Sequence, residues 1–227
     1  MTQAIIVSHG QPSDPQIGEA EIAALARSVS AYCDFSVSGV TLASPGALEA
    51  QMDLEPDAVV YPMFMTNGWF TRVELPRRIG DRAVRILPPF GTDPALAPAV
   101  AKYLTSLCHA RGWDIGDVGL AILGHGSGRS DAVARETFNF VEAVKTDFEP
   151  ARLTVGFVEQ DPPLSEALDD LGPKSFILPF FAARRGHVLD DIPQAAAKKS
   201  YCGHILEPVG LLDFCSEMIA HKLAKAI

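Results

Sequence analysis

The chain has 227 residues, of which 48% are hydrophobic and 21% charged, a composition that is typical of a globular protein and excludes a disordered or fibrous one. Its net charge of −9 leaves no excess of Lys and Arg for phosphates or acidic lipids, so we predict that neither nucleic acid nor a membrane is a partner. No basic segment followed by a long apolar run opens the chain, which predicts a cytoplasmic protein without a leader.

Apolar runs and amphipathic stretches alternate along the chain, which predicts strands alternating with helices. In the first half, strands are expected at 4–8, 36–42, 58–63 and 83–87, and helices at 15–32, 47–54, 73–80 and 94–107. In the second half, strands are expected at 119–124, 153–158, 175–180 and 204–207, and helices at 131–147, 164–171, 189–198 and 212–224. This alternation predicts an α/β fold with two four-stranded parallel sheets, each flanked by helices.

The two halves of the sequence repeat one another in the same order. Similar segments pair 4–10 with 120–126 (AIIVSHG and LAILGHG), 54–62 with 171–179, and 85–91 with 204–210. Ordered matches at a nearly constant offset predict an internal duplication. We therefore predict two similar lobes, residues 1–115 and 116–227, that share a cleft.

Three polar residues lie at strand ends in the second half, where parallel sheets bind their ligands. His125 ends the first strand, Glu159 ends the second and His187 follows the third. Two imidazoles and a carboxylate suit a divalent ion such as Co²⁺, Fe²⁺, Ni²⁺ or Zn²⁺, and they also suit proton transfer near neutral pH. For either histidine alone, a turn with a hydrogen-bonded imidazole is the alternative interpretation.

The repeat provides an internal control for this set of residues. The aligned residues of the first half are His9, Leu42 and Phe70, so the first half keeps a single histidine. We therefore predict that the second half carries the chemistry, and that His9 lines the cleft from the other side. Asp191 aligns with Glu74 in the first turn of a predicted helix, which favours a structural role for both acids.

Cationic and glycine-rich segments next to the histidines predict an anionic ligand. Arg184 and Arg185 directly precede His187, and Arg129 follows the first strand of the second half. Arginine pairs in bidentate fashion with carboxylates, although a solvated loop is the alternative. Ser127 lies in the segment GHGSGRSD, which resembles a phosphate-binding loop but lacks its lysine and spacing, so a helix N-cap at Ser130 or Asp131 is the alternative explanation of this segment.

The segments that carry these residues resemble a known family. AILGHGSGRSD, GFVEQDPPLSEAL and FILPFFAARRGHVLDDIP are similar to signature segments of the sirohydrochlorin chelatases, the class II enzymes that insert cobalt or iron in cobalamin and sirohaem synthesis. The resemblance covers essentially the whole chain and implies two α/β lobes with the tetrapyrrole between them. It implies that His125, His187 and Glu159 handle the metal, and that no organic cofactor or ATP is needed. Phe70 departs from members whose N-terminal lobe carries the histidine pair.

Together these observations predict an enzyme that inserts Co²⁺, or alternatively Fe²⁺ or Ni²⁺, into sirohydrochlorin or a related tetrapyrrole. The peripheral carboxylates of the macrocycle are expected to meet Arg184, Arg185 or Arg129. A metal or tetrapyrrole carrier without turnover is the main alternative. A phosphoryl- or acyl-transfer enzyme that uses Ser127 is a second alternative, although Ser127 has no obvious base in the sequence. A monomer and a homodimer both stay open.

Overall fold

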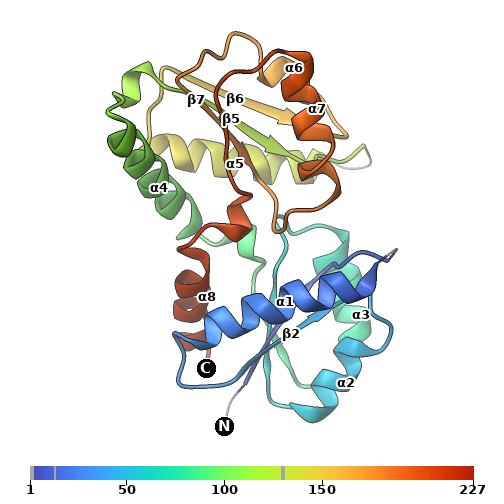
Figure 1. Cartoon of the computed structure of the whole chain (residues 1–227). Helices are drawn as coiled ribbons and strands as arrows, with labels where there is room; N and C mark the ends of the chain where they lie inside the picture. The colour runs from blue at the N-terminus through green and yellow to red at the C-terminus, as the bar shows by residue number, and fades with distance from the viewer. Residues whose placement is uncertain (1–2, 13, 129–130) are drawn as a thin grey trace. The chain divides into compact units, whose positions relative to one another are not determined.

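The computed structural model describes residues 3–12, 14–128 and 131–227 (Figure 1). The described chain forms two four-stranded sheets in which every strand pair is parallel. The strand order is β2-β1-β3-β4 in the first sheet and β6-β5-β7-β8 in the second, so one topology occurs twice. The predicted α/β fold with two parallel sheets is therefore confirmed.

The strands are short and their central members are buried. The first sheet comprises β1 (Ala4–Ser8), β2 (Val37–Thr41), β3 (Val59–Pro62) and β4 (Arg85–Ile86). The second sheet comprises β5 (Gly119–Gly124), β6 (Arg152–Phe157), β7 (Ser175–Pro179) and β8 (His204–Ile205). The edge strands β4 and β8 are shorter than predicted, and Pro88 and Pro208, which have no N–H, prevent either ladder from continuing further along the chain.

Helices connect the strands in both halves. They are α1 (Pro15–Ser30), α2 (Ala47–Leu54), α3 (Leu75–Ile79), α4 (Leu96–Arg111), α5 (Asp131–Asp147), α6 (Leu164–Ala167), α7 (Asp191–Lys198) and α8 (Cys215–Ala224). A π-helical turn at Phe70–Glu74 leads into α3, whereas a 3-10 turn at Gly186–Val188 precedes α7. Helix α6 ends at Ala167, four residues before the predicted end at residue 171. Asp170 adopts a φ of 59°, which is incompatible with a right-handed helix at this position.

The first compact unit comprises Met1–Asp93 and Asp213–Ile227. Its strand side chains alternate between two faces, and those of one face pack against α2 and α3. The buried residues of this cluster are Ile5, Val7, Val40, Leu48, Met52, Ala58, Val60, Leu75 and Ile79. Helix α1 packs against β2 and α8 (Figure 1).

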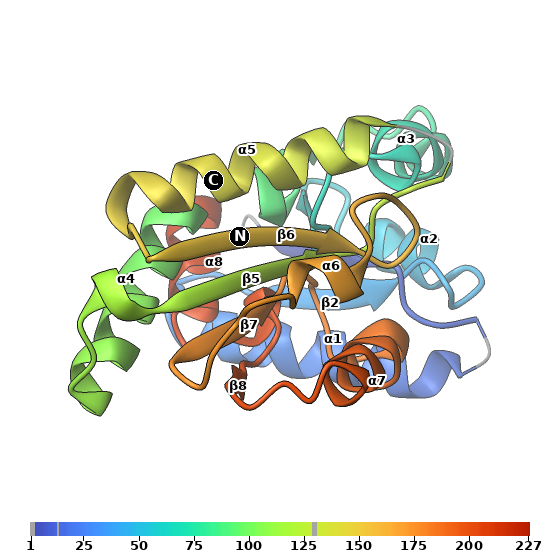
Figure 2. The same cartoon turned by 90° about the horizontal axis from the view of Figure 1, so that it is seen from above.

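The second compact unit comprises Pro94–Leu212. One face of β5 and β7 packs against α6 and α7, through a buried cluster that includes Leu123, Leu164, Ile177 and Ile192. Helix α5 lies along one face of this sheet and α7 along the other (Figure 2). Helix α4 packs against α5. The second sheet is therefore covered on both faces, as parallel sheets require.

The compact units exchange their last helices relative to the sequence repeats. Helix α4 ends the first repeat but packs in the second unit, and α8 ends the second repeat but packs in the first unit. The division of the sequence into repeats at residues 115 and 116 stays a prediction, and the compact units differ from these repeats by one helix each.

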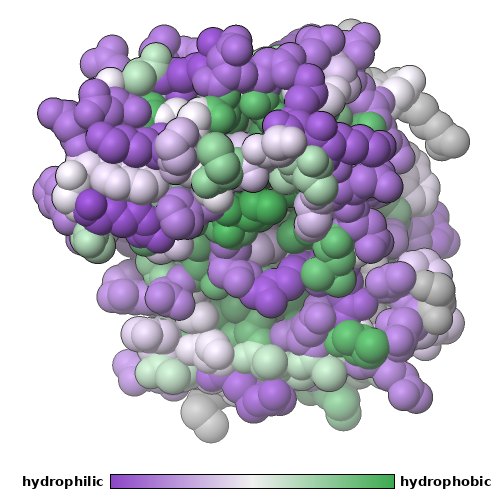
Figure 3. All heavy atoms as spheres, turned by 45° about the horizontal axis from the view of Figure 1, so that its top comes forward, coloured by the Kyte–Doolittle hydropathy of each residue, from purple (hydrophilic) through white to green (hydrophobic). Residues whose placement is uncertain are grey.

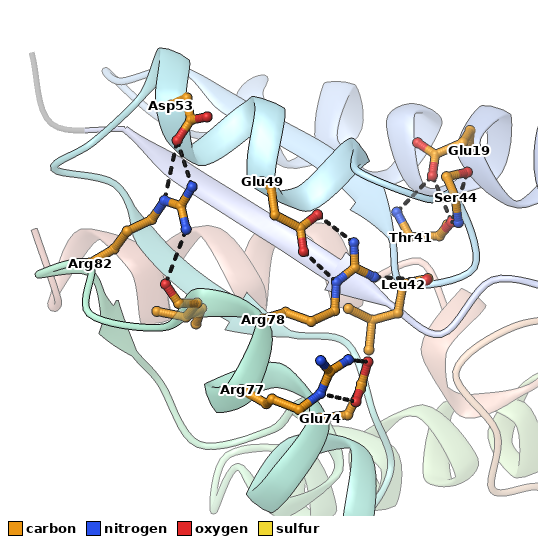
Figure 4. A network of polar contacts seen from close by, with 11 residues as sticks. Glu19, Thr41, Leu42, Ser44, Glu49, Asp53, Glu74, Arg77, Arg78 and Arg82 are labelled. Carbon is orange, nitrogen blue, oxygen red and sulfur yellow. Dashed lines mark hydrogen bonds and ion pairs between the residues drawn. The ribbon is translucent and has the colours of Figure 1, made fainter.

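Polar contacts close the end of β2 in the first unit (Figure 4). Arg78 of α3 donates to Glu49 of α2 at 2.6 Å and to the carbonyl oxygen of Leu42 at 2.8 Å. Thr41, which is fully buried, donates through its N–H and its hydroxyl to Glu19 at 2.8 and 2.6 Å. These bonds tie α1, α2 and α3 to the same strand end.

Most of the surface on the face drawn in Figure 3 is hydrophilic, with hydrophobic atoms in smaller groups. Within the described ranges, no helix combines the length and hydropathy that crossing a bilayer needs.

Candidate metal centre

His125, Glu159 and His187 lie together beyond the carboxyl ends of β5, β6 and β7. One ligand atom from each lies within 4.8 Å of the other two. The strand order β6-β5-β7 explains this proximity, because the three strands are neighbours and His125 follows the central one. Among the described residues, this is the one group of three or more His, Cys, Asp or Glu side chains close enough to hold a metal ion. Their role as ligands stays a prediction.

A tight turn positions His125 at the end of β5. Gly126 adopts a φ of +72°, and a Cβ at this position would approach the Cβ atoms of Gln160 and Phe157 to 2.8 and 2.9 Å. Only glycine fits this turn without displacement of its neighbours. The His125 Nδ1 atom lies 3.0 Å from the Gly126 carbonyl oxygen. If Nδ1–H donates this bond, Nε2 is the ring atom that can bind a metal ion.

Glu159 reaches the same place from the loop after β6. Its backbone N–H donates to the His125 carbonyl oxygen at 2.9 Å, which fixes the two loops to one another. The Glu159 Oε2 atom lies 3.8 Å from Nδ1 of His125, and the two side chains are 54% and 46% exposed. Both groups are therefore open to solvent, so an ion can reach them without unfolding of the edge.

His187 enters from the 3-10 turn that precedes α7. Its ring meets the His125 ring edge-on, with centroids 4.7 Å apart and an interplanar angle of 84°. Its Nδ1 atom lies 2.6 Å from Oδ2 of Asp191. Asp191 opens α7, as predicted for a first-turn acid, but its contact with His187 was not predicted. The spacing of four residues between an imidazole and a carboxylate at a helix start is the sequence signal for such a pair.

The remaining predicted ligand-binding residues have different outcomes. Arg184 donates to Glu207 through Nε at 3.0 Å, and both side chains are about half exposed. Arg185 is partly buried. The Ser127 backbone N–H donates to Oε1 of Gln160 at 3.1 Å, so this loop is held by a side chain. Arg129 lies outside the described residues.

The first unit repeats this turn at the same edge of its own sheet. His9 Nδ1 lies 2.7 Å from the Gly10 carbonyl oxygen, and Gly10 adopts a φ of +71°. The ring of Phe70 meets the His9 ring edge-on at 4.3 Å and 78°. Phe70 thus occupies the place that His187 has in the second unit, where a hydrocarbon ring offers no ligand atom.

Leu42 is not the counterpart of Glu159, contrary to the sequence alignment. The N–H of Ala43 donates to the His9 carbonyl oxygen at 2.9 Å, as that of Glu159 does to His125. The paired residues of β1 and β2 correspond at one constant offset to those of β5 and β6. The prediction erred by one residue because the repeat offset drifts outside the strands. Ala43 is therefore the counterpart of Glu159, and its methyl group stands in the first unit where the second unit has the Glu159 carboxylate.

Solved structures share this fold. The sirohydrochlorin chelatase SirB from Bacillus subtilis subspecies spizizenii, solved with cobalt, matches with a TM-score of 0.71 and 15% identity over 99% of this chain and 95% of that chain. Two parallel sheets of this topology, together with the structural matches, define the fold as that of the class II chelatases.

Closer similarity gives the family. The solved structure described as CbiX, the terminal enzyme for biosynthesis of siroheme in denitrifying bacteria, has a TM-score of 0.89 and 38% identity over 99% of each chain. The CbiX family model matches residues 119–226, which include all three clustered residues. The chain belongs to the CbiX family, which confirms the resemblance seen in its sequence.

A curated relative from Halobacterium salinarum is described as a probable sirohydrochlorin cobaltochelatase. It is 21% identical over 169 residues, and the match covers 62% of this chain. The chain spans 58% of the length of that relative.

Proposed function

We propose that the protein inserts a divalent metal ion into sirohydrochlorin or a closely related tetrapyrrole, with Co²⁺ as the first candidate and Fe²⁺ and Ni²⁺ as alternatives. The observation that carries this proposal is the cluster of His125, Glu159 and His187, whose ligand atoms lie within 4.8 Å at an exposed sheet edge. Membership of the CbiX family supports it, because relatives are described as a siroheme-biosynthesis enzyme and a probable cobaltochelatase.

The ligand set suits a metal that is a substrate. Two imidazoles and one carboxylate are borderline ligands that bind several first-row divalent ions. Three protein ligands also leave coordination positions open for water or for the incoming ring nitrogens. Affinity for such a set rises from Fe²⁺ through Co²⁺ to Ni²⁺ whatever the biological metal, so affinity alone does not identify the metal that is inserted.

The reaction needs a proton acceptor as well as a metal site. The inserted ion bonds to four ring nitrogens, two of which first carry a proton, so two N–H bonds break and two protons leave the macrocycle for each ion inserted. Glu159 and the two imidazoles are bases within reach of the bound ion, and they can pass these protons to solvent from an exposed edge. Nothing is oxidised or reduced, so the step needs no redox cofactor, and the resemblance to the sirohydrochlorin chelatases implies that no ATP is needed.

Arg184 is the first candidate for contact with the substrate carboxylates. Its partner Glu207 is about half exposed, and exposed ion pairs contribute little to stability. A carboxylate of the macrocycle can therefore replace Glu207 at the guanidinium. Arg185 and Arg129 are further candidates, since both flank segments of the same cluster in the sequence.

Insertion is tested by mixing the protein with sirohydrochlorin and Co²⁺, Fe²⁺ or Ni²⁺ while the absorbance of the macrocycle is followed. We expect His125→Ala, His187→Ala and Glu159→Gln each to lower the insertion rate by about 100-fold, since each removes a ligand and a base. His9→Ala is the matched control, because it removes the same side chain from the same turn of the first unit. It is expected to retain the rate.

Two outcomes would contradict the proposal. Saturable Co²⁺ binding without faster insertion identifies a carrier and excludes the chelatase. Loss of activity in His9→Ala, with activity retained in His125→Ala, places the site in the first unit and excludes the site described above.

A further inference from the structure

We propose that Asp191 is a positioning residue, which holds His187 in the one tautomer that presents Nε2 to the incoming metal ion. This inference rests on the proposed function, because it assigns a role relative to the proposed metal site. The residue touches neither the ion nor the macrocycle in this role and acts only through the imidazole.

The contact itself dictates the tautomer. The Asp191 Oδ2 atom lies 2.6 Å from Nδ1 of His187, which is within the range of a short charge-assisted hydrogen bond. An ionised carboxylate can only accept hydrogen bonds, so Nδ1 carries the proton. The Nε2 atom of the neutral ring then keeps its lone pair, and Nε2 becomes the ligand atom. The carboxylate also increases the electron density of the ring, which strengthens the ligand.

The two histidines obtain this orientation from different sources. His125 Nδ1 lies 3.0 Å from the backbone carbonyl oxygen of Gly126, so no partner side chain is needed to orient this ring. The orientation of His187 depends instead on the side chain of Asp191. The exposed fractions of the His187 and Asp191 side chains are 36% and 44%. The orientation of His187 is therefore the one that removal of a single partner side chain can abolish.

The start of α7 fixes the distance between the two partners. The N–H groups of Leu189 and Asp190 both donate to the Gly186 carbonyl oxygen at 2.9 Å, which closes a tight turn around His187. Helix α7 begins at the next residue, so the Asp191 side chain lies one helical turn from the imidazole.

The first unit supports a specific role for this acid. Phe70 and Glu74 have the same spacing as His187 and Asp191, but a phenyl ring has no N–H to donate. Glu74 is instead bonded by Arg77, through Nε at 2.9 Å and Nη2 at 2.7 Å. Asp191 thus contacts the side chain four positions earlier, which is a histidine, whereas Glu74 pairs with Arg77.

The first test measures Co²⁺ affinity of the metal-free protein by competition with a colorimetric chelator. We expect Asp191→Ala to bind Co²⁺ about 10–100-fold more weakly, which is the usual effect of removing such an orienting carboxylate. Asp191→Glu, which retains the carboxylate, is expected to recover part of the affinity. Asp190→Ala is the matched control, because Asp190 is an exposed acid beside the same helix start whose side chain makes no capping hydrogen bond.

The second test reads the tautomer directly. In ¹⁵N-labelled, metal-free protein, two-bond correlations of the imidazole are expected to show His187 protonated at Nδ1. In Asp191→Ala the signal is expected to shift toward the Nε2–H form, while the His125 signal stays unchanged. A purely structural role for Asp191 at the helix start would leave the His187 tautomer as it is.

The outcomes separate this inference from the proposed function. Wild-type Co²⁺ affinity in a folded Asp191→Ala, combined with a loss of affinity in His187→Ala, overturns the inference and leaves the metal site intact. Affinity that depends on neither His187 nor His125 overturns the proposed site, and the inference falls with it. Recovery by Asp191→Glu, together with an unchanged Asp190→Ala, supports the inference.

Discussion

At the scale of single residues, the clustered histidine depends on the glycine that follows it. Gly126 has a positive φ, and the Cβ atoms of Phe157 and Gln160 leave no room for a side chain there. Gly46 has a similar φ of +76°, but a Cβ there would meet nothing within 4 Å. Substitution of Gly46 therefore measures the free-energy cost of the left-handed backbone conformation alone, whereas substitution of Gly126 adds the cost of the steric clash.

We predict that Gly126→Ala destabilises the protein more than Gly46→Ala does. The left-handed conformation costs about 1–2 kcal/mol for a residue with a Cβ, and only Gly126→Ala adds contacts below 3.0 Å. Urea unfolding measures the difference in free energy. Co²⁺ titration is expected to show weaker binding for Gly126→Ala alone, because His125 moves with the turn. Equal stabilities and equal affinities of the two variants would contradict this explanation.

A second prediction concerns Arg184. We expect Arg184→Gln to raise the KM for the macrocycle by about tenfold, since a bond to a charged carboxylate is lost, while Co²⁺ affinity stays the same. Arg152→Gln is the control, because Arg152 pairs with Asp170 at 3.8 Å and opens β6, at the other end of the strand from the cluster. Steady-state kinetics with varied sirohydrochlorin measures both. An unchanged KM in Arg184→Gln would remove Arg184 from the substrate contacts.

At the scale of elements, one guanidinium joins α2, α3 and the end of β2. Arg78 is 10% exposed at its side chain and forms two bonds with Glu49, besides its bond to the Leu42 carbonyl oxygen (Figure 4). The hydrogen bond from Arg78 holds the pKa of Glu49 below its ordinary value. A carboxyl whose pKa is lowered by folding stabilises the protein above its unfolded pKa, and this stabilisation is lost as pH falls through the folded pKa.

We predict that Glu49→Gln lowers the free energy of unfolding by about 1 kcal/mol at pH 7, since solvent screens a partly exposed pair. The difference from the wild type is expected to shrink as pH falls through the lowered folded pKa of Glu49, because the carboxyl then becomes protonated and the ion pair is lost. Urea unfolding at several pH values measures this dependence. Asp53→Asn is the control, because the Arg82–Asp53 pair is more exposed, and its effect is expected to be smaller. A difference for Glu49→Gln that persists unchanged at low pH would exclude the ion pair as its cause.

At the scale of the whole molecule, the exchange of helices α4 and α8 couples the two repeats. Ile219 of α8 and Leu104 of α4 are both fully buried. Because α8 packs against α1 and α4 packs against α5, each helix completes the core of a unit formed mainly by the other repeat. Truncation of a buried side chain in α4 should therefore destabilise the second repeat, and truncation of one in α8 should destabilise the first repeat.

We predict that Ile219→Ala and Leu104→Ala each cost about 2–5 kcal/mol, the usual range for truncation of a buried aliphatic side chain. Hydrogen–deuterium exchange locates the effect. Ile219→Ala is expected to lower protection in α1, and Leu104→Ala in α5, although both lie in the opposite repeat. The reverse pattern, with each substitution acting within its own repeat, would contradict the exchange.

The alternation of apolar runs and amphipathic stretches was sufficient to predict the two parallel sheets, because these patterns depend on the local sequence of each strand and helix. The sequence repeat added that both sheets have the same order of elements. Parallel strands bring His125 and Glu159 to one edge, and the loop and 3-10 turn after β7 bring His187 to the same place. The Asp191 contact was missed because it depends on the 3-10 turn at Gly186–Val188, which the sequence pattern represents only as a helix beginning nearby. Arg184 and Glu207 are 23 residues apart, and their pairing depends on loops that have no periodicity. The helix exchange was missed because an apolar helix face fits either sheet.

The repeated histidine–glycine turn has a practical consequence for spectroscopy. His9 and His125 share the same histidine–glycine turn and the same type of carbonyl contact, and each has an aromatic ring edge-on beside it, but only the neighbour of His125 is an imidazole, and only His125 has a carboxylate nearby. In a metal titration at constant pH, the His9 resonance then serves as an internal reference for changes of temperature and salt. Any displacement of the His125 resonance relative to it isolates the response of the ligand cluster within a single sample.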